Sequence, residues 1–380
     1  MNMKEPGVSG GNKSRVRPRK IRIWFTAILL VLVMLICAAV AVLIPLYQAY
    51  RKSHMDVPLV TRDDTYTRPP EPTFDDDTAD PDGTDPTDTT DAPDTEPDDT
   101  EPDETTHKPV NVPGIYKVNK KDPDIENILI LGTDSRNVQV ERGRSDSIIV
   151  ASFNKRTKEV KLVSFLRDTY IPIEGHGWNR INVAYAVGGV ALCVNTINDL
   201  FGLDIQKFVI VNFSGASSFV DACGGVDMAL TEKEKNYLLN LKDEFPQNSD
   251  GTYHLDGSVA LDYMRMRKID SDFGRTERQR KTMMAIYNQA MARKDVTQMY
   301  NLVREGFNLV RTNLTLSEML DLASSIISLG GDLSMKSESI PPRSTKNLAW
   351  SNQYIDKKSV LWIEDLDEAK KYVVNLIYGT

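Results

Sequence analysis

Acidic and basic side chains stand in pairs between residues 127 and 170, beside runs of apolar residues. Asp134 lies in Gly-Thr-Asp-Ser-Arg, and Asp146 stands two positions after Arg144. Arg167 and Asp168 are adjacent a little further along. Carboxylates suit a hard cation such as Mg²⁺, while the planar fork of arginine binds phosphate oxygens in pairs. These residue types predict a site that takes a cation and an anionic substrate together.

Asp134 and Asp146 are the candidate metal ligands of this stretch. If the runs beside them form neighbouring strands, both carboxylates can reach one cation. Mg²⁺ usually takes only one or two carboxylates and fills its shell with waters and phosphate oxygens. The competing interpretation is turn capping, because an aspartate after Gly-Thr commonly accepts hydrogen bonds from backbone N–H groups. Spacing alone leaves both interpretations open.

A second arginine-rich stretch follows residue 264. In an extended chain Arg265 and Arg267 share one face, with methionines on the other. The run Asp-Phe-Gly-Arg-Thr-Glu-Arg-Gln (272–279) predicts a glycine turn that opens a helix, with Arg275, Arg278 and Gln279 on neighbouring rows. A helix N-terminus adds oriented N–H groups for an anion. The alternative, a solvated face of a surface helix, fits Arg265 and Arg267 poorly because apolar residues alternate with them.

The elements that must position these residues alternate between strands and helices. Short apolar runs predict strands at Ile128–Leu131, Ser147–Phe153, Val160–Phe165, Phe208–Val211 and Val226–Leu230. Longer periodic segments predict helices at 183–200 with a break at two glycines, and at 214–221, 232–241, 257–263 and 275–293. Alternation of this kind predicts an α/β fold with a central, mostly β sheet flanked by helices, over a catalytic domain at 110–295. Residues 296–380 are predicted to be mostly helical, with a strand at Ser334–Ile340, and either complete that fold or form an appendage.

An uncharged apolar run, Ile23–Tyr47, precedes all of these elements. At about 1.5 Å per residue it can cross a hydrocarbon core of about 30 Å, which predicts a transmembrane helix within 21–50. The apolar core of a cleavable signal peptide is shorter, at about 7–15 residues. Six basic residues lie between 13 and 22. The positive-inside rule therefore predicts a cytoplasmic tail at 1–20 and an extracellular location for everything after residue 50.

The chain carries a net charge of −8, but this charge is unevenly distributed. Residues 56–107 contain 19 acidic residues and two arginines, whereas residues 108–380 are nearly neutral. A stretch dominated by Asp, Thr, Glu and Pro lacks the apolar surface to fold, which predicts a disordered, extended linker at 51–109. The neutral domain and its extracellular location disfavour nucleic-acid binding. Cys193 and Cys223 form either one disulfide or two buried thiols.

Templates for other chemistries are missing from the sequence. The four histidines are scattered and form neither His-x-x-x-His nor His-Glu-x-x-His. The sequence also contains no Gly-x-Ser-x-Gly elbow and no P-loop. These absences leave the aspartates and arginines as the residues that carry the predicted chemistry.

The order of several short motifs resembles the LytR-CpsA-Psr family. They are Ile-Leu-Ile-Leu-Gly-Thr-Asp-Ser-Arg, Arg-Ser-Asp-Ser-Ile, Ser-Phe-Leu-Arg-Asp-Thr-Tyr, Asn-Arg-Ile-Asn-Val-Ala-Tyr, Val-Asp-Ala-Cys-Gly-Gly-Val, Arg-Met-Arg and Asp-Phe-Gly-Arg-Thr-Glu-Arg-Gln. The resemblance covers roughly residues 124–293 and is thin over 296–380. Cys223 departs from the family pattern, which favours an aliphatic residue there. The predicted membrane anchor fits the resemblance.

The resemblance implies a phosphotransferase at the outer face of a Gram-positive-type membrane. Such enzymes move a teichoic acid- or capsule-like glycopolymer from undecaprenyl pyrophosphate to a sugar hydroxyl of peptidoglycan. Carried over by position, Asp134 and Asp146 would hold Mg²⁺, or Mn²⁺ in its place. The residues implied to bind the pyrophosphate are Arg144, Arg167, Arg265, Arg267, Arg275 and Gln279. Asp272 would orient these arginines, Arg144 would face the developing charge, and Asp134 or Asp168 could deprotonate the acceptor.

A binding or sensory protein of the same fold is the alternative function. Such a protein, of the transcription-attenuator type, would hold polyprenyl phosphate or wall polymer without turnover. The paired carboxylates Asp134 and Asp146 favour the enzyme, because a protein that only bound a polyanion would not need both of them.

Overall fold

The computed structural model describes residues 42–62, 67–72, 109–133, 144–241, 244–267, 269–292, 296–328, 334–355 and 358–379. The chain divides into two compact units, Met1–Gln48 and Ala49–Thr380. The predicted tail at 1–20, most of the predicted transmembrane helix and the linker from 73 to 108 lie outside the described residues. Residues 42–53 are helical.

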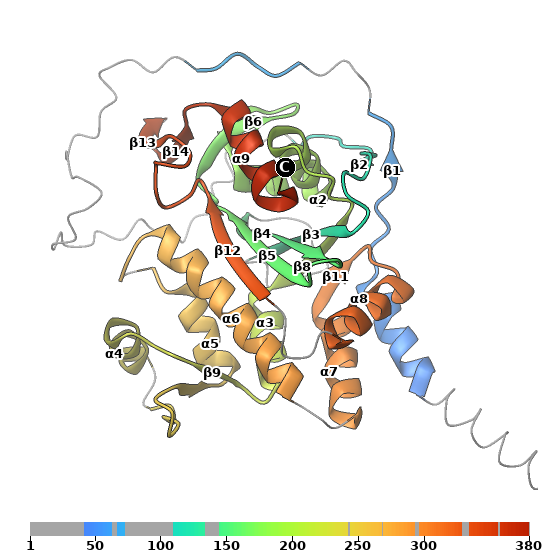
Figure 1. Ribbon diagram of the computed structural model, residues 1–380, viewed down its shortest axis with the longest axis vertical. Coiled ribbons are helices and arrows are strands. Elements are labelled where there is room, and N and C mark those ends of the chain that lie inside the picture. Colours follow the sequence, from blue (N-terminus) through green and yellow to red (C-terminus); the bar gives the residue numbers. More distant parts are fainter. Residues whose placement is uncertain are drawn as a thin grey trace, which may run out of the picture. The chain divides into compact units, whose positions relative to one another are not determined.

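A six-stranded sheet forms the centre of the second unit. It consists of β3 (Ile125–Thr133), β4 (Ser145–Asn154), β5 (Glu159–Phe165), β8 (Lys207–Asn212), β11 (Val310–Thr312) and β12 (Ser334–Ile340), in the order β11-β8-β3-β4-β5-β12 (Figure 1). The strands β3, β4 and β5 are mutually antiparallel, β8 runs parallel to β3, and β12 runs parallel to β5. The strands predicted at 128–131, 147–153, 160–165, 208–211 and 334–340 are therefore confirmed as parts of one sheet. The strand predicted at 226–230 lies instead in a separate two-stranded sheet.

The register brings several chain segments to one edge of this sheet. Thr133 at the end of β3 pairs with Ser145 at the start of β4, and also with Asn212 at the end of β8. Phe165 at the end of β5 pairs with Ile340 at the end of β12. Arg144, which precedes β4, and the residues that follow β5 and β8 therefore leave the sheet at the same edge.

Helices cover both faces of the sheet (Figure 1). The helix α2 (Ile181–Phe201) and the C-terminal helix α9 (Leu366–Tyr378) pack on one face and share the main hydrophobic core with it. The other face packs against α6 (Asp272–Ala292) and α8 (Leu316–Ser328) through a smaller apolar cluster. The break predicted in α2 is confirmed at Gly189, whose φ of 65° and ψ of −164° interrupt the helix.

The helix α2 is also apolar enough to raise the question of a membrane. Among the described residues it alone has the length and hydropathy of a membrane span. However, 83% of its most apolar window is buried inside the protein. Its hydrophobic character is therefore explained by its place in the core.

A second, four-stranded sheet was not predicted from the sequence. It is built from β6 (Thr169–Ile173), β7 (Gly177–Arg180), β13 (Trp350–Ile355) and β14 (Lys358–Ile363), in the order β13-β14-β6-β7. Because β11, β12, β13, β14 and α9 all come from residues 296–380, this block completes the fold. The predicted strand Ser334–Ile340 is confirmed as β12, and the block also contains three strands that were not predicted, β11, β13 and β14.

The remaining elements pack around a second apolar core. They are α3 (Phe213–Ala222), β9 (Val226–Met228), α4 (Glu232–Leu241), β10 (Tyr253–Leu255), α5 (Gly257–Arg265) and α7 (Val296–Leu309). Val226, Leu238, Leu255, Tyr263 and Met266 form the centre of this core. The core fixes the end of α5, where the arginine pair predicted from the sequence stands.

The start of the predicted linker is ordered, which differs from the prediction of disorder from residue 51. The short strand β1 (Leu59–Val60) pairs in parallel with β2 (Ile115–Tyr116). The Met55 amide donates to the carbonyl oxygen of Thr312 at 2.8 Å, and Met55 and Val57 pack against the main core. A strand of two residues is too short for side-chain periodicity to reveal, because its order comes from backbone hydrogen bonds.

Both cysteines of the second unit are free thiols. Cys193 is buried in α2, and Cys223 is buried at the end of α3. Burial raises the pKa of the Cys193 thiol to about 12. Of the two alternatives left open by the sequence, the structure has two buried thiols.

Candidate active site

Charged residues from four segments meet at the sheet edge where β3 and β5 end and β4 begins. Asp146 is the second residue of β4, and Arg167 and Asp168 connect β5 to β6. Arg267 follows α5, and Asp272 opens α6. This convergence follows from the register, which places both ends of the β3–β4 connection beside the end of β8.

Asp146 is the point on which three guanidinium groups converge. Its Oδ1 atom accepts from Arg167 Nη1 at 2.9 Å and from Arg267 Nη2 at 3.4 Å. Its backbone carbonyl oxygen accepts from Arg275 Nη2 at 3.4 Å. Arginines separated by more than 100 positions in the sequence are thus held within reach of one ligand.

Arg167 links three carboxylates. It contacts Asp146, its Nε donates to Asp168 Oδ2 at 3.3 Å, and the same Nε lies 3.9 Å from Asp272 Oδ1. Burial alone would lower the pKa of Arg167, but the charges of these three carboxylates outweigh burial and raise it. Arg167 is therefore a permanently charged group at the centre of the site.

Asp168 is held by two arginines, one on each of its oxygens. Arg167 binds Oδ2, and Arg180 Nη1 donates to Oδ1 at 3.1 Å. Arg180 was not among the residues selected from the sequence, although it ends the loop Gly-His-Gly-Trp-Asn-Arg directly before an apolar helix. With both oxygens engaged, Asp168 is better suited to positioning arginines than to taking a proton from an acceptor.

Arg275 and Asp272 form a buried ion pair on the first turn of α6, between Nη2 and Oδ1. Only 1% of Arg275 is exposed. Its Nε and Nη1 atoms and the Oδ2 atom of Asp272 have no hydrogen-bond partner among the described residues. Buried donors without partners are costly, so the unused donors of Arg275 call for an acceptor that the described residues do not supply.

Two further buried polar groups belong to the same region of the fold. Gln279 lies one helical turn after Arg275 and is 6% exposed, and its Oε1 atom has no partner in the described part of the chain. The same holds for the hydroxyl of Ser145, directly before Asp146. These groups extend the set of unused polar atoms along α6 and the start of β4.

Of the remaining predicted residues, the structure describes Arg144 and Arg265. Arg144 is half-buried and directly precedes β4. Arg265 is exposed at the end of α5, with its guanidinium carbon 5.0 Å from the ring centroid of Phe213, which follows β8. Asp134 lies outside the described residues, directly after Thr133.

Carboxylate oxygens suit a hard divalent cation, but the described residues of this site supply few that could serve as metal ligands. No group of three or more His, Cys, Asp or Glu that could hold a metal ion occurs among the described residues. Asp146 is the predicted ligand that is described, and its Oδ1 atom already accepts from two arginines. Oxygen ligands from Asp134 and Asp146 fit the chemistry of Mg²⁺, which also takes waters and phosphate oxygens.

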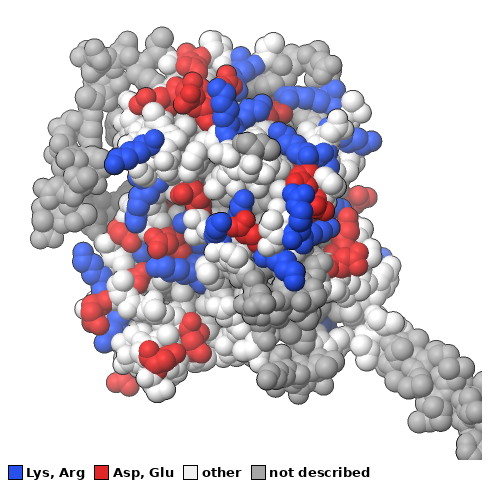
Figure 2. Space-filling view, in the orientation of Figure 1, with Lys and Arg blue, Asp and Glu red and all other residues white. Residues whose placement is uncertain are grey.

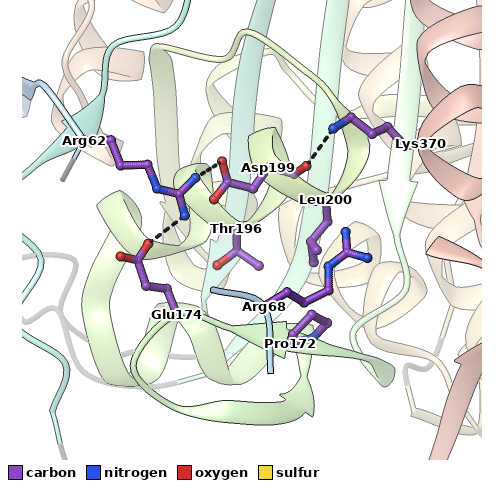
Figure 3. Close-up of a pocket in the computed structure, with 8 residues that line it drawn as sticks. All are labelled: Arg62, Arg68, Pro172, Glu174, Thr196, Asp199, Leu200 and Lys370. Atoms are coloured by element: carbon purple, nitrogen blue, oxygen red, sulfur yellow. Dashed lines mark hydrogen bonds and ion pairs between the residues drawn. The ribbon is translucent and has the colours of Figure 1, made fainter. Parts of the chain in front are cut away.

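A pocket of about 260 Å³ lies elsewhere, beside the C-terminal half of α2 (Figure 3). Its lining residues are Arg62, Arg68, Pro172, Glu174, Thr196, Asp199, Leu200 and Lys370. Arg62 bridges Asp199 at 2.8 Å and Glu174 at 3.5 Å, and Lys370 donates to the backbone oxygen of Asp199 at 3.4 Å. These contacts attach the ordered segment that contains Arg62 to the domain. Because they have this structural role, no chemistry is assigned to the pocket.

The surface charge agrees with the neutral composition of the folded unit. Basic and acidic side chains are interspersed over the face drawn in Figure 2. The described residues of that face show no continuous basic stripe of the kind that tracks a nucleic-acid backbone.

The fold and the site together define an α/β protein with a cluster of arginines and aspartates at one edge of its central sheet. The LytR_cpsA_psr family model matches residues 90–369. The chain therefore belongs to the LytR-CpsA-Psr family.

A curated relative in Bacillus cereus is the polyisoprenyl-teichoic acid–peptidoglycan teichoic acid transferase TagU. It is 37% identical over 209 residues, which cover 54% of this chain and 65% of the relative. The chain thus matches slightly less than two thirds of that protein's length.

Solved structures of TagT share the fold. The crystal structure of Bacillus subtilis TagT is 27% identical, with a TM-score of 0.54 over 69% of this chain and 95% of TagT. A structure of YwtF (TagT) with bound octaprenyl pyrophosphate lipid is 25% identical, with a TM-score of 0.52 over 69% of this chain and 95% of that one.

Proposed function

We propose that this protein is a phosphotransferase that moves a teichoic acid- or capsule-like glycopolymer from undecaprenyl pyrophosphate to a sugar hydroxyl of peptidoglycan. The observation that carries the proposal is the buried Arg275, whose Nε and Nη1 donors lack partners among the described residues beside Arg167 and Arg267. The transferase name of TagU and the pyrophosphate lipid bound to TagT support the same chemistry.

The arginines perform the charge neutralisation that phosphoryl transfer requires. The acceptor oxygen bonds to the phosphorus next to the glycopolymer, and the bond from that phosphorus to the bridging oxygen breaks. Undecaprenyl phosphate leaves and a phosphodiester forms. Such reactions depend on positioning and electrostatic stabilisation more than on covalent catalysis. Arg167 and Arg275 bind the diphosphate oxygens, and Arg144 faces the charge that develops on the leaving group.

Asp134 is the proposed acceptor of the proton from the sugar hydroxyl. Asp168 was the other candidate, but Arg167 and Arg180 occupy both of its oxygens, so its proposed role is to position them. Asp272 orients Arg275 through their ion pair, and Gln279 adds a polar group one turn further along α6.

Mg²⁺, or Mn²⁺ in its place, is the proposed cofactor, held by Asp134 and Asp146. When bound, the cation supplies additional charge neutralisation for phosphate oxygens. Asp146 also accepts from Arg167 and Arg267, so it would couple the metal side of the site to the arginine side.

The proposed location is the outer face of a Gram-positive-type cell membrane. The uncharged run Ile23–Tyr47, with basic residues before it, supports a single-pass anchor with a cytoplasmic N-terminus. The acidic stretch 73–108 then serves as a spacer between the membrane and the domain. Nucleic acid is not a proposed partner.

Binding of polyprenyl phosphate or wall polymer without turnover is the second candidate function. It is favoured by one observation: arginines occupy both oxygens of Asp168 and one oxygen of Asp146. A transferase would then depend on Asp134 to take the proton from the acceptor hydroxyl, and this residue lies outside the described ones.

A transfer assay separates the two functions. The full chain is incubated with a lipid-pyrophosphate glycopolymer, peptidoglycan oligomers and Mg²⁺, beside Asp134→Ala and Arg144→Ala. Arg156→Ala is a matched control, because Arg156 is an exposed arginine in the turn after β4, at the opposite end of that strand. The proposal predicts transfer by the parent and the control and little by the other two. Full activity of both site variants would refute the assignment, and binding without transfer would favour the second function.

A further inference from the structure

Arg278 is a buried arginine of α6 whose guanidinium group forms hydrogen bonds with residues that follow α5. It is 1% exposed and lies one turn after Arg275. Its Nη2 atom donates to the carbonyl oxygen of Met266 at 2.7 Å. Its Nη1 and Nη2 atoms bind the two oxygens of Asp270 at 2.7 and 2.8 Å. A bidentate pair of this kind is both strong and geometrically specific.

Met266 is the residue between Arg265 and Arg267, and it is held from two directions. Its side chain is fully buried in the second core, and its carbonyl oxygen is bound by Arg278. Its φ of −54° and ψ of 123° end α5 and place the neighbouring arginines on the exposed side. Met266 thus fixes the backbone position from which the side chain of Arg267 reaches Asp146.

Gly274 provides the space in which Asp270 lies. The sequence predicted a glycine turn here, but Gly274 is already inside α6. A Cβ atom at this position would overlap the carboxylate of Asp270, which Arg278 holds in place. The glycine is therefore required by the close approach of a carboxylate.

We propose that Arg278 is a positioning residue for the diphosphate site. Through its contacts it holds Met266 and Asp270 against α6, and so fixes where Arg267 meets the substrate. Arg278 itself does not need to touch the substrate. This inference rests on the proposed function, because the ligand positioned by Arg267 is the diphosphate of the donor.

The size of the expected effect follows from geometry. The side chain of Arg267 is 42% exposed, and its contact with Asp146 is long, at 3.4 Å. The position of the Arg267 guanidinium group therefore depends on the backbone that carries it. The loss of one hydrogen bond to a charged group weakens binding about tenfold or more, so a misplaced Arg267 should weaken donor binding by about that factor.

The test measures the dissociation constant of octaprenyl pyrophosphate for the full chain at a temperature where every variant is folded. Arg278→Met and Gly274→Ala each disturb the contact with Asp270, and Gly274→Ala does so while Arg278 remains. Arg280→Met is the matched control, because Arg280 is a buried arginine of the same helix that binds Ser164 Oγ at 2.8 Å. Arg278→Lys keeps the charge and is expected to restore part of the affinity.

A double-mutant cycle with Arg267→Ala distinguishes positioning from general stabilisation. If Arg278 acts through Arg267, then Arg278→Met costs about tenfold in the parent and little in the Arg267→Ala background. Arg280→Met is expected to lower the melting temperature without this coupling. Unchanged affinity in Arg278→Met and Gly274→Ala, or losses that simply add to that of Arg267→Ala, would overturn the inference. A parent protein that does not bind the lipid would overturn the proposed function itself.

Discussion

Arg275 and Asp272 are ion-paired on the first turn of α6, yet burial shifts the pKa of each group toward its neutral form. Burial lowers the pKa of Arg275 to about 10, and it raises the pKa of Asp272 despite the nearby Arg275 and Arg167. The pair thus does not compensate fully for its own desolvation, which is common for buried ion pairs. A bound anion that takes the unused Nε and Nη1 donors of Arg275 completes the arrangement.

Replacing the Arg275–Asp272 pair should separate function from stability. The double variant Arg275→Met/Asp272→Asn removes two incompletely paired buried charges, so its melting temperature should equal or exceed that of the parent. Its affinity for octaprenyl pyrophosphate should fall about 10- to 100-fold, because a hydrogen bond to a charged group contributes about 1.5–3 kcal/mol. Thermal denaturation and lipid titration measure both effects. A fall in melting temperature with unchanged affinity would show that the pair serves only the fold.

The raised pKa of Asp272 predicts a specific dependence of stability on pH. Because its folded-state pKa is raised, the folded protein binds this proton more tightly than the unfolded chain does. The stabilising contribution is therefore complete below the ordinary aspartate pKa and is lost as pH rises through the folded-state value. Urea unfolding of the parent and of Asp272→Asn across the acidic range should show the parent losing stability relative to the variant. A constant difference between the two would contradict the shift.

Removing Arg180 should affect the site through Asp168. Without the 3.1 Å contact from Arg180, Asp168 is free to turn toward Arg167 and draw its guanidinium away from the substrate. We expect kcat/KM for transfer to fall about tenfold in Arg180→Ala, the cost of about one charged hydrogen bond. Arg62→Ala is a suitable control. Arg62 also bridges two carboxylates, but it does so in the pocket beside the C-terminal half of α2. Equal losses of activity in both variants would indicate a general effect on folding.

Chelation of divalent ions should stop transfer while leaving part of the lipid binding intact. The proposed cation is held by Asp134 and Asp146, whereas the Nε and Nη1 donors of Arg275 make no hydrogen bond to Asp146. Adding EDTA should abolish turnover, and Mg²⁺ or Mn²⁺ should restore it in the parent but not in Asp146→Asn. Binding of octaprenyl pyrophosphate measured in EDTA reports on the arginines alone. Unchanged turnover in EDTA would remove the metal from the proposed mechanism.

Much of the sheet was predictable because buried strands are short, apolar and separated by clear turns. The antiparallel pairing of β4 with β5 then places the start of β4 beside the end of β5, and this explains why Asp146 and Arg167 belong together. Arg267, Asp272 and Arg275 could be proposed from their motifs, but only the fold shows that Arg267 and Arg275 meet Asp146.

Other features had no local signal in the sequence. The strands β6 and β7 are short and mix aromatic and polar residues, so the sheet that presents Arg180 to Asp168 was not predicted. Arg278 was placed on a helix beside Arg275, yet its grip on Met266 depends on tertiary contacts with the end of α5. The ordered segment at residues 49–62 is held by backbone hydrogen bonds, which leave no side-chain pattern.

The central claim is that the diphosphate of the donor is cleaved at the arginine cluster, with transfer of the polymer-side phosphate. Donor labelled with radioactive phosphorus either at the polymer-side or at the lipid-side phosphate tests this claim directly. Transfer by the parent should place the polymer-side label in peptidoglycan as a phosphodiester and leave the lipid-side label in undecaprenyl phosphate, while Arg275→Ala should do neither. Appearance of the lipid-side label in peptidoglycan, or of neither label with an active donor, would contradict it.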